Sequence, residues 1–96
     1  MKLKIIGPDN RVVIDGETFP VNLAAFGWHP AYHAVQYDDD TGSGEVEWRP
    51  MGGVSPPNIK INRDQLMGMF GGVVEHTKNM LVAKRALEDA KKAGAS

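Results

Sequence analysis

Residues 33–49 read HAVQYDDDTGSGEVEWR, and they decide the fold because two short alternating runs flank a polar loop rich in Gly and Asp. Val35 and Tyr37 share one face of the first run, and Val46 and Trp48 share one face of the second. Alternation with a period of two is typical of a half-buried strand, and the loop composition is typical of a turn. The stretch therefore predicts a β-hairpin whose apolar face, with Trp48 in it, closes a small core.

Three shorter β-type runs precede the hairpin and predict an antiparallel meander over residues 2–21. The GPDN sequence at 7–10 is a strong turn signal, because Pro fixes φ and the Asp and Asn side chains bond to the nearby backbone. Asp15-Gly16 is the dipeptide that a type I′ hairpin turn prefers, since both central residues need positive φ. Pro20 cannot donate a ladder hydrogen bond, so we expect the third strand at an edge or its end there.

Two segments break the β pattern. In residues 22–32, we expect Asn22 to cap one helical turn over residues 23–26, which Gly27 would end. Residues 50–58 hold three of the six prolines and predict a linker, after which residues 58–61 are a candidate for one more short strand.

The loop after Gly27 is dense in aromatic residues and leaves two interpretations open. It is either a lid that buries Phe26 and Trp28 over the open end of the sheet, or an exposed binding loop. Large aromatic side chains are mostly buried in folded proteins, which favours the lid. The exposed alternative would present Trp28, His29 and Tyr32 to a ligand.

The remainder of the chain, residues 62–96, has a helical pattern. Asn62 followed by Gln65 matches a capping box in its Asn variant, and Asp64 in the first turn suits the helix dipole. Apolar residues then recur at heptad-like spacing, at Leu66, Phe70, Val73, Met80 and Leu87. Gly71-Gly72 interrupts this pattern, since each Gly costs about 1 kcal/mol in a helix interior relative to Ala.

The glycine pair leaves two arrangements of the helix open. A continuous helix from residue 63 to 92 would be about 45 Å long, whereas a compact 61-residue β unit spans about 25–30 Å. Such a helix would outrun the sheet, and its apolar stripe Leu66, Phe70, Val73, Met80 and Leu87 would form an interface with a partner or a second copy. A helix broken at Gly71-Gly72 would lie on the sheet of its own chain. We expect a homo-oligomer or a docked subunit.

The composition is that of an ordinary globular protein, with 96 residues, 42% hydrophobic residues, 24% charged residues and a net charge of −1. The absence of Cys excludes disulfides, thiolate nucleophiles and Cys-based metal sites. The apolar run near the N-terminus spans only Ile5 and Ile6, so we expect no signal peptide, and no stretch is long enough for a membrane span. The balanced charge and the scattered basic residues predict no nucleic-acid partner.

The motifs of common active sites are missing from the sequence. There is no Gly-x-Ser-x-Gly elbow, no Walker sequence and no Gly-x-Gly-x-x-Gly. His29 and His33 are four apart with Pro30 between them, which argues against a helical metal site. The acidic loop at 38–45 resembles a calcium loop in composition but has its Gly at the wrong position. We therefore expect no enzyme activity, no metal and no cofactor.

Four short motifs carry a resemblance to a known group of proteins. They are, in order, VIDG at 13–16, HAVQ at 33–36 followed by an aromatic residue, GEVE at 44–47 followed by an aromatic residue, and PN at 57–58. This set resembles small proteins of tailed bacteriophages and prophages that are encoded among tail and tail-fibre genes. The chain departs from the group at Tyr37, where Trp is usual, in its longer acidic loop and in its C-terminal helix.

The resemblance implies a role but supplies no catalytic residues. It implies a structural or accessory protein of the tail or tail fibre, located in the virion or in the host cytoplasm during assembly, with other tail or tail-fibre proteins as partners. An assembly chaperone that leaves before maturation is one alternative, and a small-ligand or host-surface binding module is another.

From the residues themselves we predict an α+β fold with two parts. Residues 1–61 would form an antiparallel sheet of four or five strands, and residues 62–96 one C-terminal helical segment.

Overall fold

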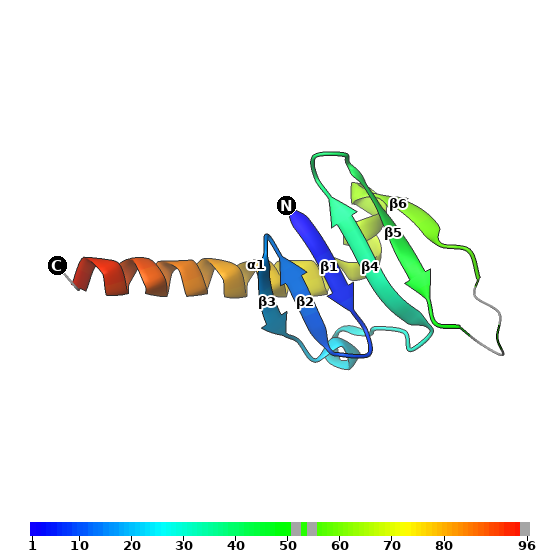
Figure 1. Cartoon of the computed structure of the whole chain (residues 1–96), viewed down its shortest axis with the longest axis horizontal. Helices are drawn as coiled ribbons and strands as arrows, with labels where there is room; N and C mark the ends of the chain where they lie inside the picture. Colours follow the sequence, from blue (N-terminus) through cyan, green and yellow to red (C-terminus); the bar gives the residue numbers. More distant parts are fainter. Residues whose placement is uncertain (51–52, 54–55, 95–96) are drawn as a thin grey trace.

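A computed structural model of the chain describes residues 1–50, 53 and 56–94. Residues 93 and 94 are described through their backbone only. Its elements are β1 (Lys2–Ile6), β2 (Arg11–Ile14), β3 (Glu17–Pro20), η1 (Leu23–Phe26), β4 (Tyr32–Asp38), β5 (Ser43–Trp48), β6 (Ile59–Asn62) and α1 (Arg63–Gly94). The fold is α+β, a six-stranded antiparallel sheet with one long helix across it, as the sequence predicted (Figure 1). The predicted count of four or five strands is too low, because residues 59–62 pair with β5 as a further strand. Residues 51–52 and 54–55 of the predicted linker, and residues 95–96, lie outside the described residues.

The strands are arranged in the order β3-β2-β1-β4-β5-β6, so the first strand lies in the middle of the sheet (Figure 1). The predicted meander is confirmed, since β2 pairs with both β1 and β3. The central hairpin joins it through β1 and β4, where Ile5 lies opposite Val35 and Leu3 opposite Tyr37. The apolar faces of the meander and the hairpin thus form one continuous surface.

The hairpin has the alternation that its sequence indicates. Val35 lies opposite Val46 in the β4–β5 ladder, and both side chains are fully buried. The register of this ladder shifts between Tyr32 and Ala34, at the end away from the loop that joins β4 to β5. Trp48 lies beyond this irregularity and is only half-buried, so the prediction that it is a core residue is wrong.

The turn predictions are confirmed at Asp15-Gly16, whose φ angles are +48° and +83°. The helical turn over residues 23–26 is also present as η1, and Gly27 ends it with a φ of +77°. The expected side-chain cap is wrong, because Asn22 makes no capping hydrogen bond. The side chain of Asn10 acts in its place, since its Oδ1 accepts a 3.3 Å hydrogen bond from the backbone N–H of Leu23.

The start of α1 is the predicted capping box. The backbone N–H of Gln65 donates to Asn62 Oδ1 and that of Asn62 donates to Gln65 Oε1, both at 2.9 Å. Instead of the predicted break at Gly71-Gly72, the helix bends one residue earlier, at Phe70, whose backbone has a non-helical φ of −130° and ψ of 17°. A pair of glycines is a common cause of such a bend, and α1 continues through it to Gly94.

One core lies between the sheet and the first half of α1. The strands contribute Leu3, Ile5, Val12, Ile14, Phe19, Val35, Tyr37, Val46 and Ile61, and the helix contributes Leu66, Phe70, Val73, Val74 and Leu81. Leu81 is the last buried residue of α1, and the helix continues for about 20 Å after it at 1.5 Å per residue. Most of this length projects past the sheet, in keeping with overall dimensions of 57 × 26 × 19 Å (Figure 1). The structure therefore combines both arrangements that the sequence left open, a bent helix on the sheet and a projecting end.

Candidate functional site

An aromatic cluster fills the corner between η1, β4, β5 and the start of α1. Tyr32 is at its centre, with ring centroids 5.7 Å from Trp28, 4.9 Å from Trp48 and 5.7 Å from Phe70. Trp28 also packs on Phe70 at 5.4 Å. The bend in α1 lies at this same Phe70, so the helix changes direction where its aromatic side chain enters the cluster.

A small cleft opens beside the cluster, with a volume of about 230 Å³. Its walls are Phe26, Gly27, Trp28, His29, Tyr32, Met69, Phe70, Gly72 and Val73. This volume is below the range of about 300–1,000 Å³ for drug-sized ligands. The cleft is suited to one apolar side chain or one flat ring, because its walls are aromatic rings and a methionine.

The structure answers the question of lid or binding loop residue by residue. Trp28 is half-buried, and its Nε1 is buried against Gly7 with no hydrogen-bond partner among the described residues. Phe26, which the lid interpretation placed inside, is 40% exposed and stacks on His76 at 5.1 Å. The lid prediction is therefore wrong for Phe26, because η1 places this ring on the outer surface of α1.

The three residues of the predicted binding loop do come together. Tyr32 is half-buried and lies 5.7 Å from both Trp28 and His29, ring centroid to ring centroid. His29 is exposed, and its Nδ1 accepts a 3.0 Å hydrogen bond from the backbone N–H of Ala31. Sequence reasoning missed Met69 and Phe70 as cleft residues, since only the fold brings α1 to this loop.

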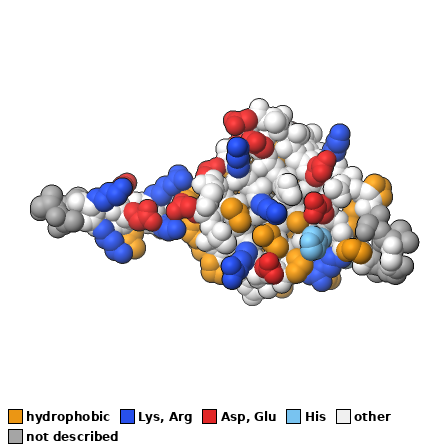
Figure 2. Space-filling model, in the orientation of Figure 1, with side chains coloured by type: hydrophobic (Ala, Val, Ile, Leu, Met, Phe, Trp, Pro, Cys, Tyr) orange, Lys and Arg blue, Asp and Glu red, His pale blue; other side chains and the backbone are white. Residues whose placement is uncertain are grey.

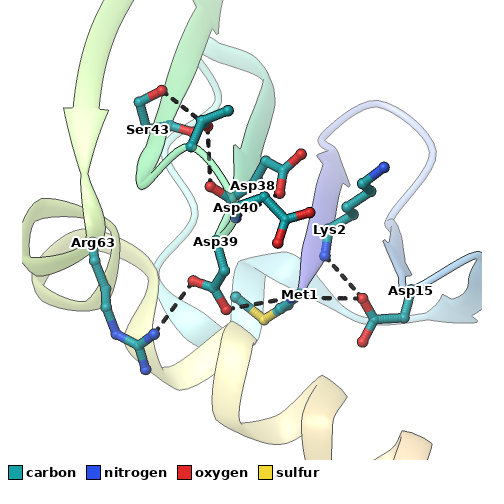
Figure 3. A network of polar contacts seen from close by, with 9 residues as sticks. Met1, Lys2, Asp15, Asp38, Asp39, Asp40, Ser43 and Arg63 are labelled. Atoms are coloured by element: carbon teal, nitrogen blue, oxygen red, sulfur yellow. Dashed lines mark hydrogen bonds and ion pairs between the residues drawn. The ribbon is translucent and has the colours of Figure 1, made fainter.

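The acidic loop of the hairpin is held by local partners (Figure 3). Asp39 accepts from Arg63 at 3.3 Å and lies 3.3 Å from the N-terminal ammonium of Met1. Asp38 Oδ1 accepts a 2.9 Å hydrogen bond from the backbone of Asp40. Among the described residues, no group of three or more His, Cys, Asp or Glu side chains could hold a metal ion.

The surroundings of Asp39 also determine its ionisation. Burial favours the neutral carboxyl, but the hydrogen bond from Tyr37 and the charges of the N-terminus and Arg63 outweigh it and lower the pKa of Asp39. Burial and the neighbouring Asp39 raise the pKa of Tyr37. The loop is thus anchored to β1 and to the start of α1 with Asp39 in its ionised form.

The outer face of the sheet carries a shallow hollow lined by charges of both signs. Lys2, Lys4 and Lys60 lie beside Asp38 and Glu45 in this hollow. On the face that Figure 2 draws, basic and acidic side chains are interspersed, with no large area of one sign. The mixed charges make the hollow an ordinary hydrated surface rather than a site for one class of ion.

The predicted interface stripe on α1 is divided between core and surface. Leu66, Phe70 and Val73 are buried in the core of their own chain, so they are not available to a partner. The stripe reaches the sheet because its first half is on the helix side that faces β2, β3 and β6. Met80 is half-buried, and Leu87 is 59% exposed on the projecting end.

The projecting end has an apolar surface of its own, which we call the distal face, formed by Val82, Ala83, Ala86, Leu87 and Ala90. All five are exposed, Val82 to 67%. At 3.6 residues per turn, the five fall within an arc of about 140°. The sequence analysis missed this face because four of its members are not in the stripe, although their three- and four-residue spacing was the available signal.

The distal face is on the opposite side of α1 from the core. Val74, Thr77 and Leu81 face the sheet and are buried. Helical geometry places the midpoint between Ala83 and Ala86 about 180° from the average direction of these three. The apolar residues of the helix therefore move from one side to the opposite side at about residue 81. The distal face is not a continuation of the surface that packs on the sheet.

Charged residues on the sheet side of the projecting end are held by the edge strand β3. Lys84 Nζ lies 3.0 Å from one carboxylate oxygen of Glu17, and Arg85 Nε lies 3.6 Å from the other. Lys84 also lies over the ring of Phe19, 5.6 Å from its centroid. These contacts join the start of the projecting end to the edge of the sheet.

Comparisons with protein-family models, with curated proteins and with solved structures found no match. In the part of the chain that the structure describes, no helix is long and apolar enough to cross a membrane.

Proposed function

We propose that this protein is a non-enzymatic structural or accessory protein of a bacteriophage tail or tail fibre, and that it acts through protein contacts. The observation that carries the proposal is the projecting end of α1, whose exposed Val82 and Leu87 face away from their own core. A helix with one apolar side is a common means of docking into the groove of a partner protein. The phage context comes from the resemblance of the VIDG, HAVQ, GEVE and PN motifs.

The domain is well suited to hold such a helix in a fixed direction. The capping box begins α1 at Asn62, the core holds it as far as Leu81, and Glu17 ties Lys84 and Arg85 to the sheet edge. A docking helix that is already ordered avoids part of the entropy cost of folding on binding. This arrangement favours a part of an assembly in the virion, or an assembly chaperone in the host cytoplasm that leaves before maturation.

Mass spectrometry of purified virions from the phage or prophage that carries the coding sequence tests the proposal. We expect peptides of this chain in the particles at a fixed ratio to the tail proteins. Complexes with tail or tail-fibre proteins in infected cells, without the chain in mature virions, would identify the chaperone instead. Absence from both would contradict the proposal.

A second function is favoured by the aromatic cleft beside Trp28, His29 and Tyr32. Aromatic walls suit the apolar face of a sugar ring, so a host-surface or small-ligand binding module is the alternative. Titration of the protein with simple glycans, followed by tryptophan fluorescence, tests it. Saturable quenching that Tyr32→Ala abolishes would favour the binding module, whereas unchanged fluorescence would count against it.

A further inference from the structure

The aromatic cleft beside η1 combines a buried base with an exposed mouth. Phe70 and Val73 are buried in it, whereas Phe26, Met69 and His29 are exposed. No Asp, Glu, Lys or Arg is among the described residues that line it. The chemistry of the cleft therefore depends on ring surfaces and on a few neutral polar groups.

The loop that carries His29 fixes the tautomer of its ring. The backbone N–H of Tyr32 donates to the carbonyl oxygen of His29 at 3.0 Å, and that of Arg49 donates to the carbonyl oxygen of Ala31 at 2.8 Å. The backbone N–H of Ala31 donates to Nδ1 of His29 at 3.0 Å. A nitrogen that accepts a hydrogen bond carries no proton, so the proton of the neutral ring is on Nε2. His29 thus brings an N–H donor to the mouth of the cleft.

The other polar side chains of the cleft add little that could accept a hydrogen bond. Nε1 of Trp28 is buried against Gly7, so this donor is not available to a ligand. Tyr32 contributes a hydroxyl group, which can donate or accept. The side chains of the cleft thus offer more donors than acceptors. A ligand with a carbonyl oxygen, which only accepts, matches them.

The walls of the cleft favour a neutral ligand. An anion would lose its hydration without a cation to pair with. Aromatic ring faces can hold an organic cation, but the rings here pack on one another. Trp28 lies 5.4 Å from Phe70 and 5.7 Å from Tyr32, centroid to centroid, which leaves no space for a cation between them. What remains is a ring with an apolar face.

We propose that the cleft binds a neutral sugar ring that carries an acetamido group, as N-acetylglucosamine does. The apolar face of the ring packs on the aromatic walls, and the acetamido oxygen accepts from Nε2–H of His29. The acetamido methyl group adds an apolar contact that a plain hexose lacks. The volume of about 230 Å³ suits one such ring. The proposal rests on the binding-module function given above as the second candidate, and names its ligand class.

Titration of the intact chain with three sugars, followed by the amide spectrum in nuclear magnetic resonance, tests the proposal. We expect N-acetylglucosamine to shift the amide signals of the cleft residues saturably. Glucose should bind at least about tenfold more weakly, because it forgoes one buried methyl group and one hydrogen bond. Glucosamine should also bind at least about tenfold more weakly, because its ammonium group would have to leave water.

Two histidine variants test the donor. His29→Ala should raise the dissociation constant for N-acetylglucosamine about three- to tenfold through the lost hydrogen bond. His33→Ala is the matched control, because His33 is exposed on β4 outside the cleft, and should change it by less than about twofold. The amide spectrum of each variant shows that the fold is kept, and the comparison of the three sugars needs no variant.

The outcomes separate this proposal from the functions on which it builds. Equal binding of glucose and N-acetylglucosamine, or tighter binding of glucosamine, would overturn the acetamido assignment and leave a binding module with another ligand. An unchanged dissociation constant in His29→Ala would overturn it as well. No binding of any of the three sugars would overturn both the assignment and the sugar-binding module. The role in the phage tail is read from virions and does not depend on these titrations.

Discussion

Gly44 allows the backbones of β4 and β5 to approach each other closely. A side chain at this position in β5 would place its Cβ only 2.1 Å from the backbone oxygen of Gln36 in β4. Backbone cannot yield as a flexible side chain can, so the absence of a Cβ is required here. Gly68 on α1 is the opposite case, because a Cβ there meets nothing within 4 Å.

The two glycines therefore make a matched pair for mutation. Gly44→Ala should destabilise the protein by about 1–3 kcal/mol through the forced shift of the strand. Gly68→Ala should stabilise it by about 0.5–1 kcal/mol, because Ala is the better helix former. Urea denaturation followed by circular dichroism measures both changes. Equal effects at the two sites would contradict this account of Gly44.

The carboxyl group of Asp39 links stability to pH at the acidic loop. Its pKa is lowered in the folded protein, so the folded state binds a proton less readily than the unfolded chain does. The contribution of the ionised Asp39 to the stability of the fold is therefore complete above the unfolded pKa of about 3.9. It is lost as the pH falls through the lower pKa of the folded state. Asp39→Asn should reduce stability between about pH 5 and 7 and make little difference at the lowest pH.

Unfolding by urea at a series of pH values measures this dependence. Asp40→Asn is the control, because Asp40 is exposed and its side chain has no partner in the loop network (Figure 3). A gap between the natural chain and Asp39→Asn that stays constant down to about pH 2 would contradict the role of the charge.

At the scale of the element, the start of α1 depends on a reciprocal pair of hydrogen bonds. Asn62→Ala should cost about 1 kcal/mol, because it leaves the backbone N–H of Gln65 without its acceptor. Asn22→Ala is the matched control at the other helical turn, where Asn22 makes no capping hydrogen bond, and should cost under about 0.5 kcal/mol. Thermal unfolding of both variants gives the comparison. A larger loss at Asn22 would contradict it.

The elements that the sequence predicted are those determined by neighbouring residues. The capping box at Asn62 and Gln65, the turn at Asp15-Gly16 and the pairing of Val35 with Val46 each depend on short spacing. What could not be predicted depends on distant contacts. Phe26 is exposed because η1 reaches α1 from outside, and Trp48 is half-buried because the ladder becomes irregular near Tyr32.

In the candidate site, too, the features set by neighbouring residues could be predicted and those set by distant contacts could not. The aromatic residues of the loop were visible in the sequence, but Met69 joins them only because α1 crosses the sheet at this point. The apolar stripe was visible too, yet its division at about Leu81 depends on the width of the sheet. A stripe drawn at heptad spacing also shifts around a straight helix by about 20° per heptad, so it passed from the core side toward the distal face.

At the scale of the whole molecule, α1 has two halves with different roles. The first half supplies Leu66, Phe70, Val73, Val74 and Leu81 to the single core. The second half makes its last contacts with the sheet at Lys84 and Arg85, through Glu17. The sheet and the first half of the helix therefore form one folding unit, and the projecting end is an addition to it.

Two truncations separate these roles. A chain that ends at Arg85 keeps every core residue and both contacts to Glu17, so its melting temperature should stay within a few degrees of the intact chain at low concentration. A chain that ends at Ile61 loses five buried apolar side chains. Each is worth about 2–5 kcal/mol, so together they are comparable with or exceed a typical stability of about 5–15 kcal/mol. This chain should be unfolded by circular dichroism. Cooperative melting of the chain that ends at Ile61 would contradict this prediction. It would mean that the sheet is stable alone and that all of α1 is available to bind a partner.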